Sequence, residues 1–209
     1  IRTFIALDIY GKDTLLKLQE ELIAVSGWLQ HKIKPIEKEN FHISFSDNIT
    51  NLVMVDEANS MHWEENTDFG GYYIYATKKC HPEENFFGLG DKSGNFNLRG
   101  RRFENWNTDA YSFGWNQDPL YRTIPFYIGL HNEAAYGIFF DNTFKSYFDF
   151  GGEDVNKTSF WADGGELQYY YIHGPHIMDV VKRYASLTGT HPMPPKWTLG
   201  YQQCRWSYY

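Results

Sequence analysis

A histidine and a serine near residue 42 are the first side chains that could do chemistry together. Apolar and polar residues alternate strictly from Phe41 to Ser46 (FHISFS), which is the pattern of a strand with two different faces. His42 and Ser44 therefore project from the same face, about 7 Å apart along the strand. One ligand could therefore contact both side chains, and the histidine could transfer a proton to or from it.

No other group of residues at catalytic or metal-binding spacing accompanies this pair. Cys80 and Cys204 lie far apart and lack a companion His or Cys at ligand spacing, so neither a zinc site nor a disulfide framework is predicted. Arg99, Arg101 and Arg102 form a short basic cluster beside an acidic residue, and we expect internal salt bridges there rather than nucleic-acid binding. No metal and no cofactor is indicated.

Charge and aromatic content narrow the class of partner. The formal net charge is −7, from 26 acidic and 19 basic residues, which disfavours nucleic acid. Aromatic residues make up 19% of the chain, a composition typical of half-buried sheets and of sites that stack on sugar faces. No apolar run reaches the roughly 18 residues of a membrane span, so no membrane partner is expected.

The N-terminal sequence bears on localisation. The segment IRTFIALDIY lacks the basic head and the small-residue cleavage site of a secretory signal, which favours the cytoplasm. Secretion would require an upstream signal that has been removed.

The first 48 residues predict a strand, a helix and a second strand. The segment 2–9 (RTFIALDI) is apolar on both faces, which indicates a buried strand. Asp13 or Thr14 then caps a helix. Its apolar positions recur at steps of four and three, at Leu15, Leu18, Leu22, Val25 and Leu29. The turn-rich NITN at 48–51 separates this β-α-β segment from the rest.

From about residue 56 onward the chain predicts short strands with no helix between them. The expected strands are Tyr72 to Ala76, Ile124 to Leu130, Ala135 to Asp141, Lys145 to Phe150 and Leu167 to His173, each bounded by Gly, Asn, Asp or Pro. This spacing is typical of an antiparallel β-sandwich, with ENFFGLGDKSGN (residues 84–95) supplying turns. One helix is expected after Gly174-Pro175, ending at Gly189. One of its faces carries Ile177, Val180, Val181 and Tyr184.

The first segment resembles the two-histidine RNA 2′,3′-cyclic phosphodiesterases, through FIALDI (4–9) and ENFHISF (39–45). Those enzymes carry two His-x-Thr/Ser motifs, whose histidines act as general acid and base. Only the motif at His42 and Ser44 occurs here, since none of the other histidines is followed two places later by Ser or Thr. The catalytic pair that this resemblance implies is therefore incomplete.

The rest of the chain resembles glycoside hydrolase family 31, the α-glucosidase family, in four blocks that occur in order. These are FFGLGDKSG, WNTDA, GIFFDN-x-x-x-x-YFDFG and PPKWTLGYQQCRW. The resemblance implies a galactose-mutarotase-like β-sandwich followed by a (β/α)₈ barrel, with Thr198 to Cys204 as the first barrel strand. It also implies hydrolysis of O-glycosyl bonds in carbohydrate metabolism.

Enzymes of family 31 take their nucleophile and their acid/base from aspartates on later barrel strands, and retaining cleavage needs two carboxyl groups about 5 to 5.5 Å apart. We therefore expect no catalytic residue in this chain and no turnover by it alone. The resemblance instead assigns substrate contact to Asp109 in WNTDA, with Trp106 beside it. A carboxylate suits this role because it accepts hydrogen bonds from two neighbouring hydroxyl groups. From the residues alone, Asn107 to Asp109 would form an ordinary turn.

Three parts are expected: a β-α-β segment over residues 1–48, a β-sandwich over 49–190 and the start of a truncated catalytic barrel over 191–209. The leading hypothesis is the N-terminal part of a retaining α-glycosidase that binds an α-glucoside or oligosaccharide and packs against the missing barrel. One alternative is a cyclic-phosphodiesterase-like protein that uses His42. The other is a non-catalytic sandwich in which Asp109, Trp106 and Trp115 bind a glycan.

Overall fold

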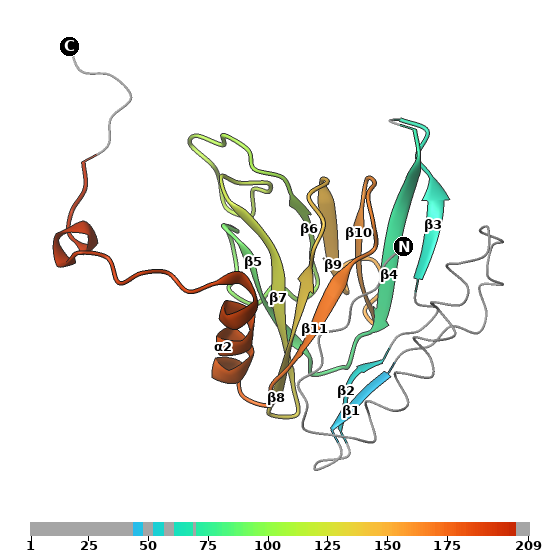
Figure 1. The fold of residues 1–209 in the computed structure, drawn as a ribbon. Coiled ribbons are helices and arrows are strands. Elements are labelled where there is room, and N and C mark those ends of the chain that lie inside the picture. Colours follow the sequence, from blue (N-terminus) through green and yellow to red (C-terminus); the bar gives the residue numbers. More distant parts are fainter. Residues whose placement is uncertain (1–43, 48–51, 57–60, 69, 204–209) are drawn as a thin grey trace.

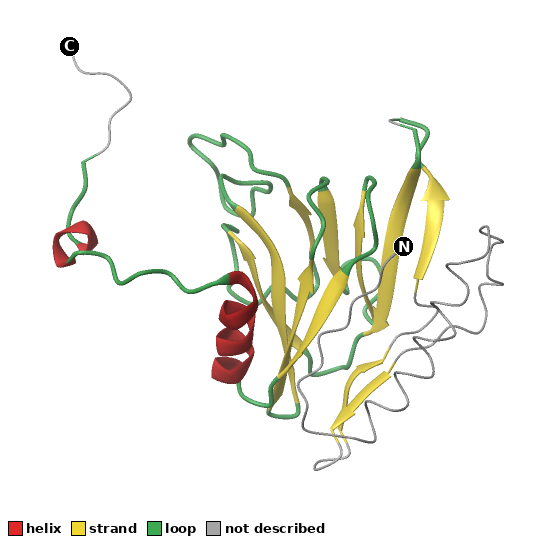
Figure 2. Cartoon of the chain, in the orientation of Figure 1, coloured by secondary structure: helices red, strands yellow, loops and turns green. Residues whose placement is uncertain are grey.

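The computed structural model describes residues 44–47, 52–56, 61–68 and 70–203, with side chains for the last two ranges. The described part of the chain is mainly β, with two large antiparallel sheets, a separate two-stranded sheet and one α-helix (Figure 1, Figure 2). The expected strand at 2–9, the helix after Asp13 and His42 lie outside the described residues. Strand β1 (Ser44–Asp47) overlaps the strand expected to end at Ser46, and it pairs with β2 (Leu52–Asp56) in a separate two-stranded sheet.

The larger sheet has five antiparallel strands in the order β3-β4-β10-β9-β6. Its strands are β3 (Met61–Glu65), β4 (Tyr72–Lys79), β6 (Arg102–Asn105), β9 (Ser146–Phe150) and β10 (Lys157–Ala162). The other sheet has four antiparallel strands in the order β11-β8-β7-β5. They are β5 (Asn85–Gly90), β7 (Thr123–His131), β8 (Ala134–Phe140) and β11 (Tyr169–His173). Their pairing confirms the predicted antiparallel sandwich.

Aromatic side chains from both sheets fill the space between them. Phe86 on β5 stacks on Phe150 on β9 with ring centroids 4.6 Å apart, which joins the two sheets directly. Phe148 and Phe160 stack beside them, and none of these four rings is more than 1% exposed. Each buried aromatic ring removes on the order of 150–250 Å² from water, so this cluster dominates the core.

The helix α2 (Ile177–Thr188) covers the outer face of the four-stranded sheet. Val180 is fully buried against Ala135 and Ile172, and Tyr184 stacks on Phe126 at 3.9 Å. The predicted helix and its end are confirmed, because the backbone N–H of Gly189 donates to the Ala185 carbonyl at 2.8 Å.

All five predicted strands after residue 56 are confirmed, with ends that shift by a few residues. The prediction for ENFFGLGDKSGN was wrong in part, because Asn85–Gly90 pairs with β7 as strand β5. The glycines suggested turns, but Gly88 is required within the strand by close packing. A Cβ there would lie 2.6 Å from the Phe126 carbonyl oxygen, and the positive φ of Gly88 and Leu89 accompanies a register shift.

The expected barrel strand at Thr198 to Cys204 does not form within the described residues, which end at Gln203. Lys196–Leu199 is a short 3-10 helix and residues 200–203 have no regular structure. A barrel strand needs neighbours on both sides to bind its N–H and C=O groups, and the segment after α2 extends away from the sandwich (Figure 1). No described helix is long and apolar enough to cross a membrane.

Candidate functional site

The long connection between β6 and β7, residues 106–122, holds both side chains that the sequence singled out for sugar contact. We call it the aromatic loop, because it exposes five large rings: Trp106, Tyr111, Phe113, Trp115 and Tyr121. Tyr111 and Trp115 are 82% and 75% exposed. Figure 1 shows the loop beyond the ends of the strands that it joins. Rings with this exposure contribute little to the core, so they are free to contact another molecule.

The two residues before Asp109 make hydrogen bonds that hold the loop, whereas the Asp109 side chain makes none within the described part of the chain. The Asn107 side-chain oxygen accepts hydrogen bonds from the N–H and the hydroxyl of Thr123, at 2.8 and 2.9 Å. The backbone N–H of Thr108 donates to the Leu120 carbonyl at 2.9 Å. The exposed carboxylate of Asp109 takes part in none of the hydrogen bonds and ion pairs of the described residues. Residues 107–109 therefore do not form the local turn expected from the residues alone, because the Asn107 side chain bonds to Thr123, 16 positions away, and the Asp109 carboxylate stays available.

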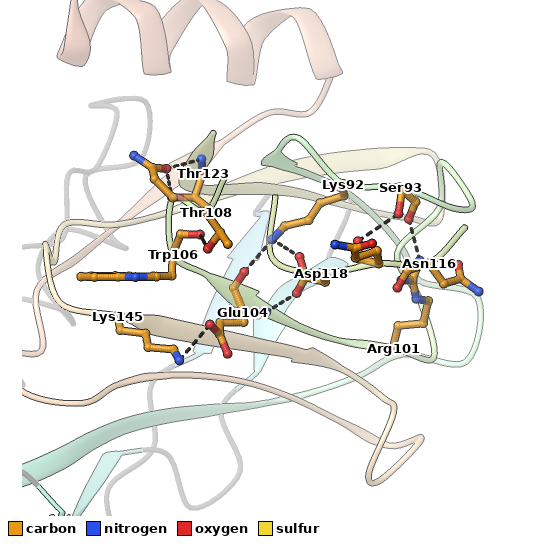
Figure 3. A network of polar contacts seen from close by, with 12 residues as sticks. Lys92, Ser93, Arg101, Glu104, Trp106, Thr108, Asn116, Asp118, Thr123 and Lys145 are labelled. Carbon is orange, nitrogen blue, oxygen red and sulfur yellow. Dashed lines mark hydrogen bonds and ion pairs between the residues drawn. The ribbon is translucent and has the colours of Figure 1, made fainter. Parts of the chain in front are cut away.

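A buried ion pair ties the two ends of the loop together (Figure 3). The ammonium group of Lys92, in the turn after β5, donates to Asp118 Oδ1 at 2.6 Å and to the Glu104 carbonyl at 2.7 Å. Asp118 Oδ2 accepts from the Glu104 N–H at 2.5 Å. The side chains of Lys92 and Asp118 are only 3% and 12% exposed, and burial lowers the pKa of Lys92.

A second set of polar contacts holds the tip of the loop (Figure 3). The Ser93 hydroxyl lies 2.9 Å from the Gln117 carbonyl and 3.3 Å from the Gly114 carbonyl. Arg101 donates to the Ser93 carbonyl at 3.2 Å and contacts the Asn116 carbonyl at 3.5 Å. The turn DKSG at 91–94 therefore contacts the aromatic loop both at its tip, through Ser93, and at its base, through Lys92.

Within the described ranges of the chain, Arg99, Arg101 and Arg102 do not form the salt bridges that the sequence predicted. The guanidinium of Arg99 donates to the carbonyls of His81 and Glu84 at 2.9 and 2.6 Å, and that of Arg102 lies 4.4 Å from the Trp161 ring centroid. None of Arg99, Arg101 and Arg102 pairs with a carboxylate among the described residues. Their neighbours are strand ends and aromatic rings, which present carbonyl oxygens and π faces rather than acids.

A closed polar cluster lies at the other end of β5 and was not predicted. Buried Glu84 accepts a 2.5 Å hydrogen bond from the Tyr136 hydroxyl and a 2.9 Å bond from the His81 N–H. The His81 and His131 rings stack at 4.3 Å beside it. Burial raises the pKa of Glu84, and burial also raises the pKa of the neighbouring Cys80 thiol to about 11, so this cysteine is an unreactive core residue.

The structure brings Trp106 and Asp109 together in one loop and leaves the phosphodiesterase pair untested. His42 lies outside the described residues, and Ser44 begins β1, where the backbone alone is described. Sequence reasoning missed Lys92 and Asp118, although DKSG was part of a noted block. No group of His, Cys, Asp or Glu in the described parts of the chain could hold a metal ion. The exposed loop therefore offers hydrogen-bond acceptance and ring stacking, the chemistry of carbohydrate recognition.

Comparison with known proteins supports the same family. The model of the glycosyl hydrolase 31 N-terminal galactose mutarotase-like domain matches residues 7–149. This match includes most of the segment 1–48, which in sequence also resembles the cyclic phosphodiesterases. Alpha-glucosidase 2 of Bacillus thermoamyloliquefaciens is 36% identical over 174 residues, covering 83% of this chain and 21% of that protein. An alpha-glucosidase of Saccharolobus solfataricus is 35% identical over 139 residues, covering 66% of this chain and 20% of its own length.

A solved relative has the same fold. The dextranase of Flavobacterium johnsoniae, a family 31 enzyme solved in complex with glucose, is 37% identical with a TM-score of 0.69. The match covers 77% of this chain and 19% of the dextranase, so the chain spans about a fifth of the length of these relatives. The family model covers more than half of the chain, and its β-sandwich is present in the structure. The chain belongs to glycoside hydrolase family 31, of which it contains the N-terminal galactose-mutarotase-like region.

Proposed function

We propose that the chain is the N-terminal part of a retaining α-glycosidase and that its aromatic loop carries Asp109 and Trp106 to the bound sugar. The observation that supports this most is the contrast within WNTDA. The Asn107 side chain accepts hydrogen bonds from Thr123 at the start of β7, and the Thr108 N–H donates to Leu120 within the loop, whereas Asp109 is exposed and about half of the Trp106 ring faces solvent. A carboxylate that accepts two hydroxyl protons beside a ring that stacks on a sugar face is a recurrent way to bind carbohydrate.

The substrate class follows from the relatives. Some proteins similar to this chain are named alpha-glucosidases and others alpha-xylosidases, and the Flavobacterium dextranase was solved with glucose and, as a variant, with isomaltotriose. We therefore propose an α-glucoside or an oligosaccharide of α-linked glucose as the substrate. In this proposal Asp109 binds hydroxyl groups near the leaving-group side of the scissile bond and has no part in proton transfer.

The catalytic nucleophile and acid/base are proposed to lie in a (β/α)₈ barrel that packs against the described residues. The surface after α2 supports this. Four large apolar side chains in this segment are more than two-thirds exposed: Met193, Trp197, Leu199 and Tyr201. Large apolar side chains that lie this exposed and close together often mark a surface that packs against another domain. In this proposal residues 191–209 begin that barrel, and Thr198 to Cys204 forms its first strand when the neighbouring barrel strands pair with it.

A chimeric enzyme tests this function. This chain would replace the matched N-terminal segment of the alpha-glucosidase 2 from Bacillus thermoamyloliquefaciens. We expect the chimera to hydrolyse an aryl α-glucoside, and the 209-residue chain alone to show no turnover. Hydrolysis by the purified chain alone would contradict the assignment of the catalytic carboxylates to the barrel. A folded chimera without activity would contradict the proposed role of the sandwich.

A second candidate, a sandwich that binds sugar without catalysis, is favoured by the exposure of Trp115, whose ring is 75% exposed on the same loop as Asp109. Titration calorimetry of the chain with maltose and isomaltose would detect it. Binding that Asp109→Ala abolishes would support this role. The control is Glu153→Ala, which removes an exposed carboxylate from the turn after β9, outside the aromatic loop, and should leave any affinity unchanged.

A further inference from the structure

The turn at 91–94 is joined to Asp118 by a buried ion pair, and contact with a sugar does not explain this pair. We propose that Lys92 and Asp118 are positioning residues, whose buried pair closes the aromatic loop and fixes where Asp109 stands. The consequence for sugar binding rests on the function proposed above. The positioning itself does not, and it can be measured on the chain alone.

The pair connects the two ends of the loop rather than two neighbouring turns. Lys92 Nζ binds the carbonyl of Glu104, just before the loop, and the carboxylate of Asp118, near its end. Asp118 in turn accepts from the N–H of the same Glu104. The three residues therefore form a closed ring of hydrogen bonds that spans the base of the loop. Closing a loop of this length costs entropy, and a fixed base lowers the number of conformations open to Asp109.

Burial separates this pair from the ordinary ion pairs of the surface. The side chains of Lys92 and Asp118 are 3% and 12% exposed, whereas those of Arg122 and Asp91 nearby are 73% and 37% exposed. Exposed pairs contribute little, because water screens them and their side chains must be ordered. A buried pair behaves differently, since removal of one partner leaves the other charge without compensation in a low-dielectric site.

The shape of the turn also fits the loop. Gly94 has a φ of 101°, and a Cβ at this position would lie 2.2 Å from the Asn116 side-chain oxygen and 2.7 Å from Arg101 Nη1. The positive φ favours glycine, and a Cβ at this position would also require the ends of the Asn116 and Arg101 side chains to shift. Ser93 then reaches two loop carbonyls from the same turn. Apolar anchoring of the loop is slight by comparison, since its buried apolar residues are Ala110 and Leu120.

Hydrogen exchange of the 209-residue chain, followed by mass spectrometry of its peptides, tests the inference. In Lys92→Met we expect amides of residues 106–118 to exchange at least tenfold faster, while peptides from β7 and β8 keep their protection. The matched control is Lys145→Met, which removes a 2.8 Å contact with the Glu104 side chain but none with the loop. Lys92→Arg, which keeps the positive charge, should restore at least part of the protection.

A second variant keeps the test decisive if Lys92→Met does not fold. Asp118→Asn preserves the shape of the side chain and leaves one acceptor where two donors point, so it should also accelerate exchange in the loop. Loop exchange within twofold of the unsubstituted chain in both variants would overturn the inference. Equal loss of protection in the loop and in β7 and β8 would overturn it too, because it would indicate a role in global stability alone.

The chimera separates this inference from the proposed function. Faster loop exchange together with a raised KM in Lys92→Met supports both. Faster loop exchange with an unchanged KM in both Lys92→Met and Asp109→Ala supports the positioning and contradicts the sugar-contacting role of the loop. Unchanged loop exchange overturns the positioning whatever the kinetics show.

Discussion

The aromatic residues of this chain occupy two regions in opposite ways. Between the sheets, Phe86, Phe148 and Phe150 are at most 1% exposed and contact one another across the core. In the aromatic loop, Tyr111 and Trp115 turn more than 70% of their surface to solvent, and polar contacts hold the backbone that carries them. The first region determines the fold by packing, whereas the backbone of the second is held by polar contacts and its rings lie outside the core. This difference supports the proposal that the loop rings contact a bound sugar.

The largest effect should come from the core. Phe148→Ala removes a fully buried ring that contacts Phe140, Phe150 and Phe160, and we expect it to lower the free energy of unfolding by about 3–5 kcal/mol. Urea denaturation followed by circular dichroism measures this change. Trp115→Ala, the matched substitution in the loop, should change it by less than about 0.5 kcal/mol. Similar losses from the two variants would remove the distinction between the regions.

The fit between the turn and the loop should have the next largest effect. Gly94→Ala places a methyl group against Asn116 and Arg101 at a positive φ, and we expect a loss of about 1–3 kcal/mol in unfolding free energy. Gly100→Ala is the control, because Gly100 also has a positive φ but no atom lies within 4 Å of the added carbon. If Gly94→Ala loses no more stability than Gly100→Ala, the close approach of the turn to the loop has no energetic role.

The closed polar cluster gives a smaller effect that depends on pH. Burial raises the pKa of Glu84 above its ordinary value of 4.5, so the folded state holds this proton at a pH where the unfolded state has lost it. The stabilisation is therefore complete below about 4.5 and is lost as pH rises through the raised pKa. Relative to Glu84→Gln, the unsubstituted chain should lose stability with rising pH in that window. If the unsubstituted chain instead gained stability relative to Glu84→Gln as pH rises, the direction of the pKa shift would be contradicted.

The smallest effect on stability, with an effect on binding, should come from Trp106. In the chimera, Trp106→Ala should raise KM roughly threefold to tenfold, the equivalent of about 0.5–1.5 kcal/mol of stacking. The melting temperature should change by less than about 1 °C, because the ring is half exposed. The reverse result, a lower melting temperature with unchanged KM, would place this ring with the core aromatics.

Local patterns were sufficient for much of the sandwich. Strands such as Ile124 to Leu130 and the helix ending at Gly189 could be predicted, because alternation, helical spacing and turn residues are properties of neighbouring positions. Strand β5 could not, since its glycines indicate turns until the packing of Gly88 against Phe126 is known. Strands β6 and β10 could not be predicted either, because they pair with β9 and β4, which lie far from them in the chain.

The candidate site could be predicted only in its exposed half. Asp109 and Trp106 stand in a recognisable block of family 31, so the resemblance pointed to them. Lys92 and Asp118 are separated by 26 positions, and nothing in their local sequence indicates that a buried ion pair joins them. Contacts of this kind depend on how β5 and β6 are placed by the whole sandwich, which no short pattern encodes.

The most direct test of the central claim, that the loop contributes a sugar-binding carboxylate to an active site, is the kcat/KM of the chimera for isomaltose and maltose with Asp109→Ala. We expect a decrease of at least tenfold, because hydroxyl groups of the bound sugar lose a charged acceptor. Glu153→Ala should keep the activity of the unsubstituted chimera. An Asp109→Ala chimera with unchanged kcat/KM for both sugars would contradict the claim.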